Sequence, residues 1–161
     1  MKFKDERVKG IVDNLVHQYH LFVSNQFINF YLMDAKISKS DWVDVEDLVN
    51  SNKYYEAEGY DLEKFYEEVL AFARFLTKIK EGVLPRIKAE TEGRLRKLTP
   101  DNQILYKMTM NNAPGNVKVF FDLISSLYVN LKRIDKEKNG EEKALYGKIR
   151  YVKEIEKLLN T

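Results

Sequence analysis

Apolar side chains recur at intervals of three and four residues along most of this chain. Because an α-helix turns through about 100° per residue, this spacing gathers the apolar side chains on one face that can be buried. The alternating pattern of a half-buried strand is hard to find. The sequence therefore predicts an all-α fold, and a length of 161 residues fits one domain that spans residues 1–161.

The clearest apolar seam lies in the last third of the chain and has the spacing of packed helices in a bundle. Its members are Val117, Phe120, Ile124, Leu127, Leu131 and Ile134. We expect its helix to begin only after the stretch NNAPGN (111–116) and to end at Asn139-Gly140. A last helix would bury Leu145, Ile149, Val152, Ile155 and Leu159. Residues 116–160 are therefore predicted to form a helical hairpin.

Other helix boundaries follow from capping residues and prolines. Asp61 is a good N-cap for a long helix, which Pro85 is expected to kink or break. Thr99 and Pro100 predict the start of a short helix that ends near Met110. Residues 38–59 suggest one short amphipathic helix and a loop. We expect an up-and-down bundle of about four long helices with one or two short helices.

The first predicted helix changes character along its length. Its first half has one apolar face, whereas residues 27–33 carry apolar side chains at all angles around the axis. Phe27, Phe30, Tyr31 and Leu32 must therefore be covered. We expect the hairpin 116–160 to enclose them, with a homo-oligomer interface through 27–33 as the alternative.

The first helix also carries the strongest candidate for metal binding. Asp13, His17 and His20 are spaced so that all three can reach one metal ion. A closed structural zinc site needs four ligands, and the chain has only two histidines and no cysteine. We therefore expect no metal and no cofactor, and read these residues as a solvated helix face.

Catalytic motifs are not evident. No serine lies in a G-x-S-x-G elbow, and the glycines of GEEKALYGK (140–148) are wrongly spaced for a phosphate-binding loop. Sequence spacing does not reveal whether two glutamates pair across helices as acid and base. A metal- or carboxylate-dependent enzyme is therefore the third hypothesis, behind two binding functions.

Nucleic-acid binding is the second hypothesis. Seven cations gather around the expected kink in residues 78–97: Lys78, Lys80, Arg86, Lys88, Arg94, Arg96 and Lys97. Such a group can follow a phosphate backbone. Against it, Glu81, Glu90 and Glu92 are interleaved, and this segment has no aromatic residue on which a base could stack.

The first hypothesis is a non-enzymatic protein-binding module, such as an adaptor, regulator or chaperone. It depends on an acidic segment, because ten of the 25 acidic residues lie within 41–68, together with the aromatic residues Trp42, Tyr54, Tyr55 and Tyr60. Aromatic side chains with polar tips are favoured at interfaces, and the carboxylates would attract a basic partner. The alternative is that these aromatics form a lid on one end of the bundle.

The location is inferred from what the sequence lacks. The N-terminal stretch MKFKDERVKG has no apolar signal core, and no run of about 18 apolar residues is present to span a bilayer. We therefore expect a cytoplasmic protein that does not bind a membrane.

Overall fold

The computed structural model describes residues 2–35 and 39–160, apart from the side chains of Asp34 and of residues 39–44. Within these ranges the helices are α1 (Glu6–Ser24), α2 (Gln26–Asp34), α3 (Lys39–Glu58), α4 (Leu62–Lys78), the π-helical turn η1 (Ile79–Val83), α5 (Leu84–Leu95), α6 (Pro100–Asn139), the short 3-10 helix η2 (Leu145–Gly147) and α7 (Arg150–Leu159). Two short strands, β1 (Lys2–Phe3) and β2 (Tyr60–Asp61), pair antiparallel. The all-α class is confirmed, whereas the up-and-down arrangement of four long helices stays a prediction.

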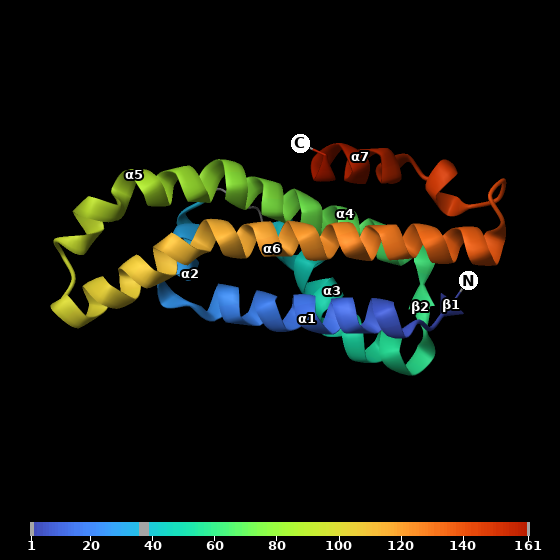
Figure 1. Ribbon diagram of the computed structural model, residues 1–161, viewed down its shortest axis with the longest axis horizontal. Helices are drawn as coiled ribbons and strands as arrows, with labels where there is room; N and C mark the ends of the chain where they lie inside the picture. The colour runs from blue at the N-terminus through green and yellow to red at the C-terminus, as the bar shows by residue number, and fades with distance from the viewer. Residues whose placement is uncertain (1, 36–38, 161) are drawn as a thin grey trace.

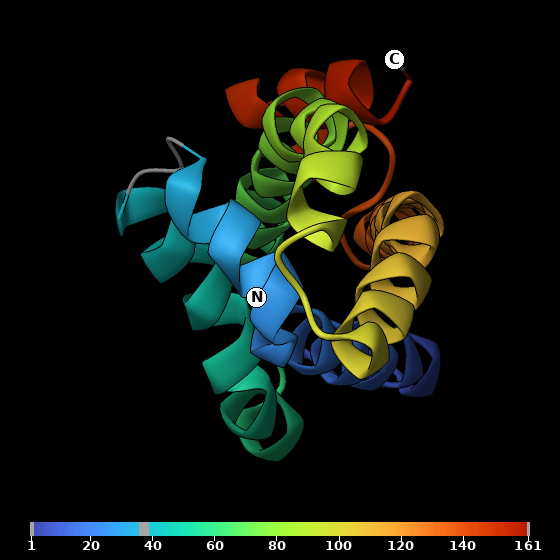
Figure 2. The ribbon, with the colours of Figure 1, turned by 90° about the vertical axis from the view of Figure 1, so that its left-hand side faces the viewer.

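Helix α6 runs along most of the molecule, with α1 on one side and α4 and α5 on another (Figures 1 and 2). Helix α4 is the central element, because it packs against α3, α6 and α7. It buries four aromatic side chains: Phe65, Tyr66, Phe72 and Phe75. Phe72 contacts Tyr19 of α1 and Phe120 of α6, with ring centroids 5.8 and 6.0 Å away. The core therefore lies where α1, α4 and α6 meet.

The predicted interruption of α6 at NNAPGN is wrong, because one helix of 40 residues passes through Pro114. Pro114 has no N–H to donate to the carbonyl of Met110, and a proline inside a helix costs about 3 kcal/mol. Burial on both sides offsets this cost: Met110 and Ala113 extend the seam that Val117 continues. The predicted seam from Val117 to Ile134 is confirmed, since all six members are buried.

The predicted hairpin of residues 116–160 is wrong in its packing. The chain does turn at Gly140, but α7 packs mainly against α4, where Val152 and Ile155 are buried. The turn is held by Asp135, a fully buried carboxylate that accepts hydrogen bonds from the backbone N–H groups of Leu145 and Tyr146 at 2.9 and 2.8 Å. This carboxylate of α6 therefore anchors the returning chain at η2, before α7 begins.

The first predicted helix is two helices, because Asn25 interrupts it. The Asn25 side chain accepts hydrogen bonds from the N–H groups of Phe27 and Ile28, at 3.0 and 3.2 Å, and so caps α2. Tyr31 is buried, and its hydroxyl lies 2.6 Å from that of Tyr106.

The expected burial of residues 27–33 is therefore only partly right. Tyr31 and Leu32 are buried and Phe27 is partly buried, but Phe30 is 43% exposed. The side of α2 that carries Phe27 and Tyr31 faces Tyr106 and Leu98, at the start of α6 and just before it, and not residues 116–160. A homo-oligomer through this segment stays a prediction.

The expected short helix and loop before Asp61 form one helix of 20 residues, α3, that ends just before Gly59. Gly59 has a φ of +90°, and a Cβ there would lie 2.9 Å from the carbonyl oxygen of Phe3. Only glycine fits this approach, which lets β1 pair with β2.

The predicted starts of α4 and α6 and the irregularity at Pro85 are confirmed, whereas the last helix begins at Arg150 and so excludes Leu145 and Ile149. The Asp61 side chain caps α4 by accepting from the N–H of Lys64, and Thr99 caps α6 by accepting from that of Asn102. The expected irregularity at Pro85 is the turn η1, in which the N–H of Leu84 bonds to the carbonyl of Ile79. A widened turn accommodates the proline ring, which would clash with the preceding turn of a regular α-helix.

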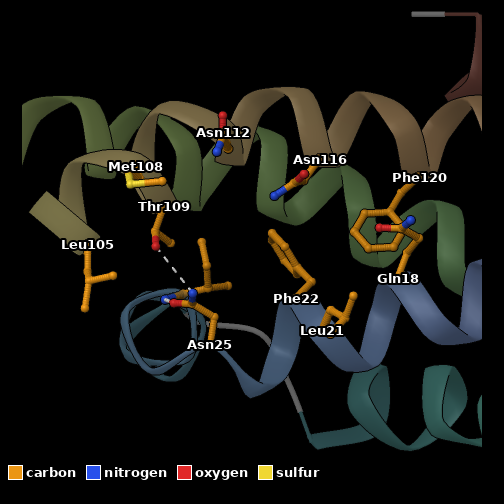
Figure 3. A pocket seen from close by; sticks show the side chains of 11 residues that line it. Gln18, Leu21, Phe22, Asn25, Leu105, Met108, Thr109, Asn112, Asn116 and Phe120 are labelled. Atoms are coloured by element: carbon orange, nitrogen blue, oxygen red, sulfur yellow. Dashed lines mark hydrogen bonds between the residues drawn. The ribbon is translucent and has the colours of Figure 1, made fainter.

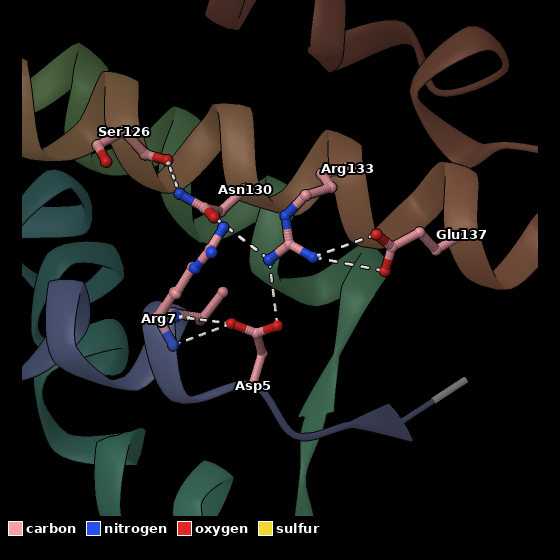
Figure 4. A network of polar contacts seen from close by, with 7 residues as sticks. Asp5, Arg7, Ser126, Asn130, Arg133 and Glu137 are labelled. Atoms are coloured by element: carbon pink, nitrogen blue, oxygen red, sulfur yellow. Dashed lines mark hydrogen bonds and ion pairs between the residues drawn. The ribbon is translucent and has the colours of Figure 1, made fainter.

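A polar network joins the start of α1 to α6 (Figure 4). Asp5 caps α1 by accepting from the N–H groups of Arg7 and Val8, and its second oxygen accepts from Arg133 at 3.1 Å. Burial favours the neutral carboxyl, but the hydrogen bonds from Val8 and Arg133 outweigh it and lower the pKa of Asp5 below its usual value.

Candidate binding surfaces

The structure divides the predicted acidic–aromatic surface into buried and exposed residues. Tyr55 and Tyr60 are part of the core, where Tyr55 stacks on Phe65 with centroids 5.4 Å apart. Tyr60 also packs against Phe3 of β1. The expectation that these two tyrosines contact a partner is therefore corrected, because no partner can reach their rings in the folded protein. They support the lid alternative.

Tyr54 is the remaining exposed tyrosine of this set, at 51%. Its hydroxyl accepts from Lys2 at 3.4 Å, and the same ammonium pairs with Glu58 at 3.2 Å. The side chain of Trp42 lies outside the described residues. Partner binding by Tyr54 and Trp42 stays a prediction.

Beneath this segment lies a buried carboxyl group that the sequence did not single out. Glu68 is only 6% exposed, and its Oε1 accepts from the Tyr55 hydroxyl at 2.5 Å. Its Oε2 has no hydrogen-bond partner among the residues that the structure describes. Burial raises the pKa of Glu68 to about 7, against the opposing effects of the Tyr55 hydrogen bond and the Lys64 charge.

Asp13, His17 and His20 all lie on an exposed face of α1. The Asp13 carboxylate accepts a hydrogen bond from Asn52 of α3 at 2.7 Å. Across the part of the chain that the structure describes, no group of three or more His, Asp or Glu side chains is placed to hold a metal ion. None of the helices in the described ranges has both the length and the apolar character needed to cross a bilayer.

The basic segment 78–97 does not form one continuous cationic face. Glu90 bonds to Arg86 at 2.9 Å and lies 3.9 Å from Arg94. The Arg94 guanidinium also stacks over the exposed ring of Phe30, 4.0 Å from its centroid. Lys78, Arg96 and Lys97 are exposed, while Lys80 and Lys88 lie beside a groove between α5 and α6. Nucleic-acid binding through the segment stays a prediction.

A groove of about 340 Å³ lies between α1 and α6, and we call it the α1/α6 groove. Phe22 and Phe120 lie at its base, with ring centroids 5.4 Å apart. Figure 3 shows Leu21 on the α1 side, with Leu105 and Met108 on the α6 side. Each of these three side chains is more than half exposed. Exposed apolar side chains that meet at one hollow are typical of binding surfaces.

The polar residues of the α1/α6 groove carry no charge. They are amides and one hydroxyl: Gln18, Asn25, Asn112, Asn116 and Thr109. Asn25 is engaged, because its Nδ2 donates to Thr109 at 3.4 Å while its Oδ1 caps α2. In a chain with 32% charged residues, an uncharged groove is a distinct local environment.

A second groove, of about 620 Å³, lies between α5 and α6, and we call it the α5/α6 groove. Ile87 and Met110 are buried at its base, while Lys80 and Lys88 are exposed beside it. Met108 and Met110 are two residues apart, so their side chains lie about 200° apart around the helix. The two grooves therefore lie on opposite sides of α6.

Sequence reasoning missed both grooves. One signal was present for the first: Ile104, Leu105 and Met108 are apolar but lie off the buried seam of Tyr106 and Met110. In comparisons with protein-family models, with curated proteins and with solved structures, this chain has no significant match.

Proposed function

We propose that this protein is a protein-binding module, an adaptor or regulator without catalysis of its own, and that the α1/α6 groove receives an uncharged apolar segment of its partner. The observation that carries the proposal is that Leu21, Leu105 and Met108 are all more than half exposed around one hollow. Full burial of a leucine or methionine side chain is worth about 1.5–3 kcal/mol. Covering all three would therefore supply a substantial part of a binding free energy.

The polar residues of the groove fit the same kind of partner. The amides of Gln18, Asn112 and Asn116 each offer a donor and an acceptor, which match the N–H and C=O groups of a peptide backbone. Among the described residues, no carboxylate or ammonium group lines the groove, so a charged segment would lose its hydration without gaining an opposite charge. The basic partner expected from the acidic segment 41–68 would bind elsewhere, through Tyr54.

The test is affinity capture from nuclease-treated cell extract with two matched variants. Met108→Lys places a charge in the groove, whereas Val129→Lys places one at an exposed position of the same helix, about 30 Å further along its axis. We expect Met108→Lys to lose the captured protein and Val129→Lys to retain it. Equal capture by both variants would refute the proposal. Bound nucleic acid in untreated extract, without a protein partner, would favour the basic segment instead.

A further inference from the structure

The α5/α6 groove combines an apolar base with a positively charged edge. Leu84, Ile87 and Met110 supply apolar surface, and Lys80 and Lys88 are exposed beside them. No acidic residue is among those that line this groove in the described part of the chain. A ligand that fills it must therefore present both apolar surface and negative charge.

Two more lysines lie along the same side of α6. Lys107 is four residues before Asn111, and Lys118 is four residues after Pro114, so both share the helix face of these two groove residues. Lys80, Lys88, Lys107 and Lys118 form no ion pair within the described residues, unlike Arg86 and Arg94, which Glu90 engages. Two lysines that line the groove and two further along the same face of α6 thus have no partner carboxylate within the described residues.

We propose that the α5/α6 groove is a second docking surface, which receives an acidic amphipathic helix of a partner protein. The apolar stripe of such a helix would pack against Leu84, Ile87 and Met110, while carboxylates on both sides of the stripe would face the four lysines. A nucleic acid has no apolar stripe to cover this base, and a fatty acid presents one carboxylate to four cations. The inference goes beyond the proposed function and does not depend on the α1/α6 groove.

Methionine methyl groups provide a direct assay, because Met110 lies in this groove, Met108 lies in the other and Met33 is exposed on α2. The full-length protein, labelled with ¹³C at its methionine methyls, is titrated with a synthetic helix of about four turns that carries a leucine stripe flanked by glutamates. We expect the Met110 resonance to shift and those of Met108 and Met33 to stay. A matched peptide with lysine for each glutamate should leave Met110 unchanged.

The charge requirement is tested by Lys80→Gln together with Lys88→Gln. We expect the acidic peptide to bind this variant about tenfold more weakly and with less dependence on salt. Lys143→Gln with Lys153→Gln removes the same charge from exposed positions outside the groove and should bind like the unmodified protein.

Several outcomes would overturn the proposal. The acidic peptide could leave the Met110 resonance unmoved, or the lysine peptide could bind equally well. Both pairs of lysine substitutions could weaken binding equally. Laurate or oligothymidylate could shift the Met110 resonance where the acidic peptide does not. A Met108 shift alone would support the α1/α6 groove and refute this site.

Discussion

Replacing Glu68 with glutamine should change the stability of the protein in a pH-dependent way. The free energy of unfolding of the variant, measured against that of the unmodified chain, should be higher at pH 8 than at pH 5. The pKa of Glu68 is raised from 4.5 to about 7 by burial. A carboxyl whose pKa is raised on folding contributes stability that is fully present below pH 4.5 and is lost as the pH rises through 7. One pKa unit corresponds to about 1.4 kcal/mol. With a pKa of 4.5 in the unfolded chain and about 7 in the folded protein, the stability lost between pH 5 and pH 8 is about 2.5 kcal/mol.

Glutamine removes the charge and keeps an oxygen that can accept from the Tyr55 hydroxyl. Urea unfolding at pH 5, 6, 7 and 8 would give the free energy of unfolding of both proteins. The difference between Glu68→Gln and the unmodified chain should grow by about 2.5 kcal/mol in favour of the variant across this range. Glu63→Gln is the matched control, because Glu63 is exposed on the same helix and is not among the charges that act on Glu68; its difference should change much less over the same range. Parallel curves for Glu68→Gln would refute the reasoning.

Three further changes test the packing. Asp135→Ala leaves the N–H groups of Leu145 and Tyr146 without their acceptor, so urea unfolding should show a loss on the order of 3 kcal/mol, with faster hydrogen exchange at both amides. Pro114→Ala restores a donor for the Met110 carbonyl and should raise the free energy of unfolding by about 1–3 kcal/mol; a loss would mean that the proline ring stabilises α6. Phe30→Ala should cost only about 1–2 kcal/mol, because the ring is 43% exposed; a cost above 3 would indicate that a second chain covers it.

Features that depend on nearby residues were predicted well. The caps at Asp61 and Thr99 need only a side-chain oxygen and a free N–H within three residues. The seam from Val117 to Ile134 needs only the helical period. Its burial does not depend on which helix covers it, so the sequence alone was sufficient.

Features decided by tertiary packing were missed. Pro114 argues locally for a break, but the buried seam on both sides keeps α6 continuous. Tyr55 and Tyr60 have the composition of an interface, yet α4 covers one and β1 the other. Asn25 was read as part of a continuous helix, although its side chain is a strong N-cap that allows two helices to meet at this point.

The candidate binding surfaces could not be predicted either. A groove exists only where two helices diverge, and its lining comes from residues distant in sequence, such as Leu21 and Met108. In the segment 78–97, glutamates are interleaved with the lysines and arginines. The fold pairs Glu90 with two arginines and leaves Lys80 and Lys88 beside apolar surface. Composition reports charges, whereas the fold decides which of them remain unpaired.

The most direct test of the proposed function is site-specific photo-crosslinking in living cells. A photoreactive amino acid at position 108 lies in the α1/α6 groove, whereas one at position 129 lies outside it on the same helix. The account predicts one discrete crosslinked protein from position 108 and none from position 129. Crosslinks of equal yield from both positions, or none from position 108 while the intact partner is still captured, would contradict it.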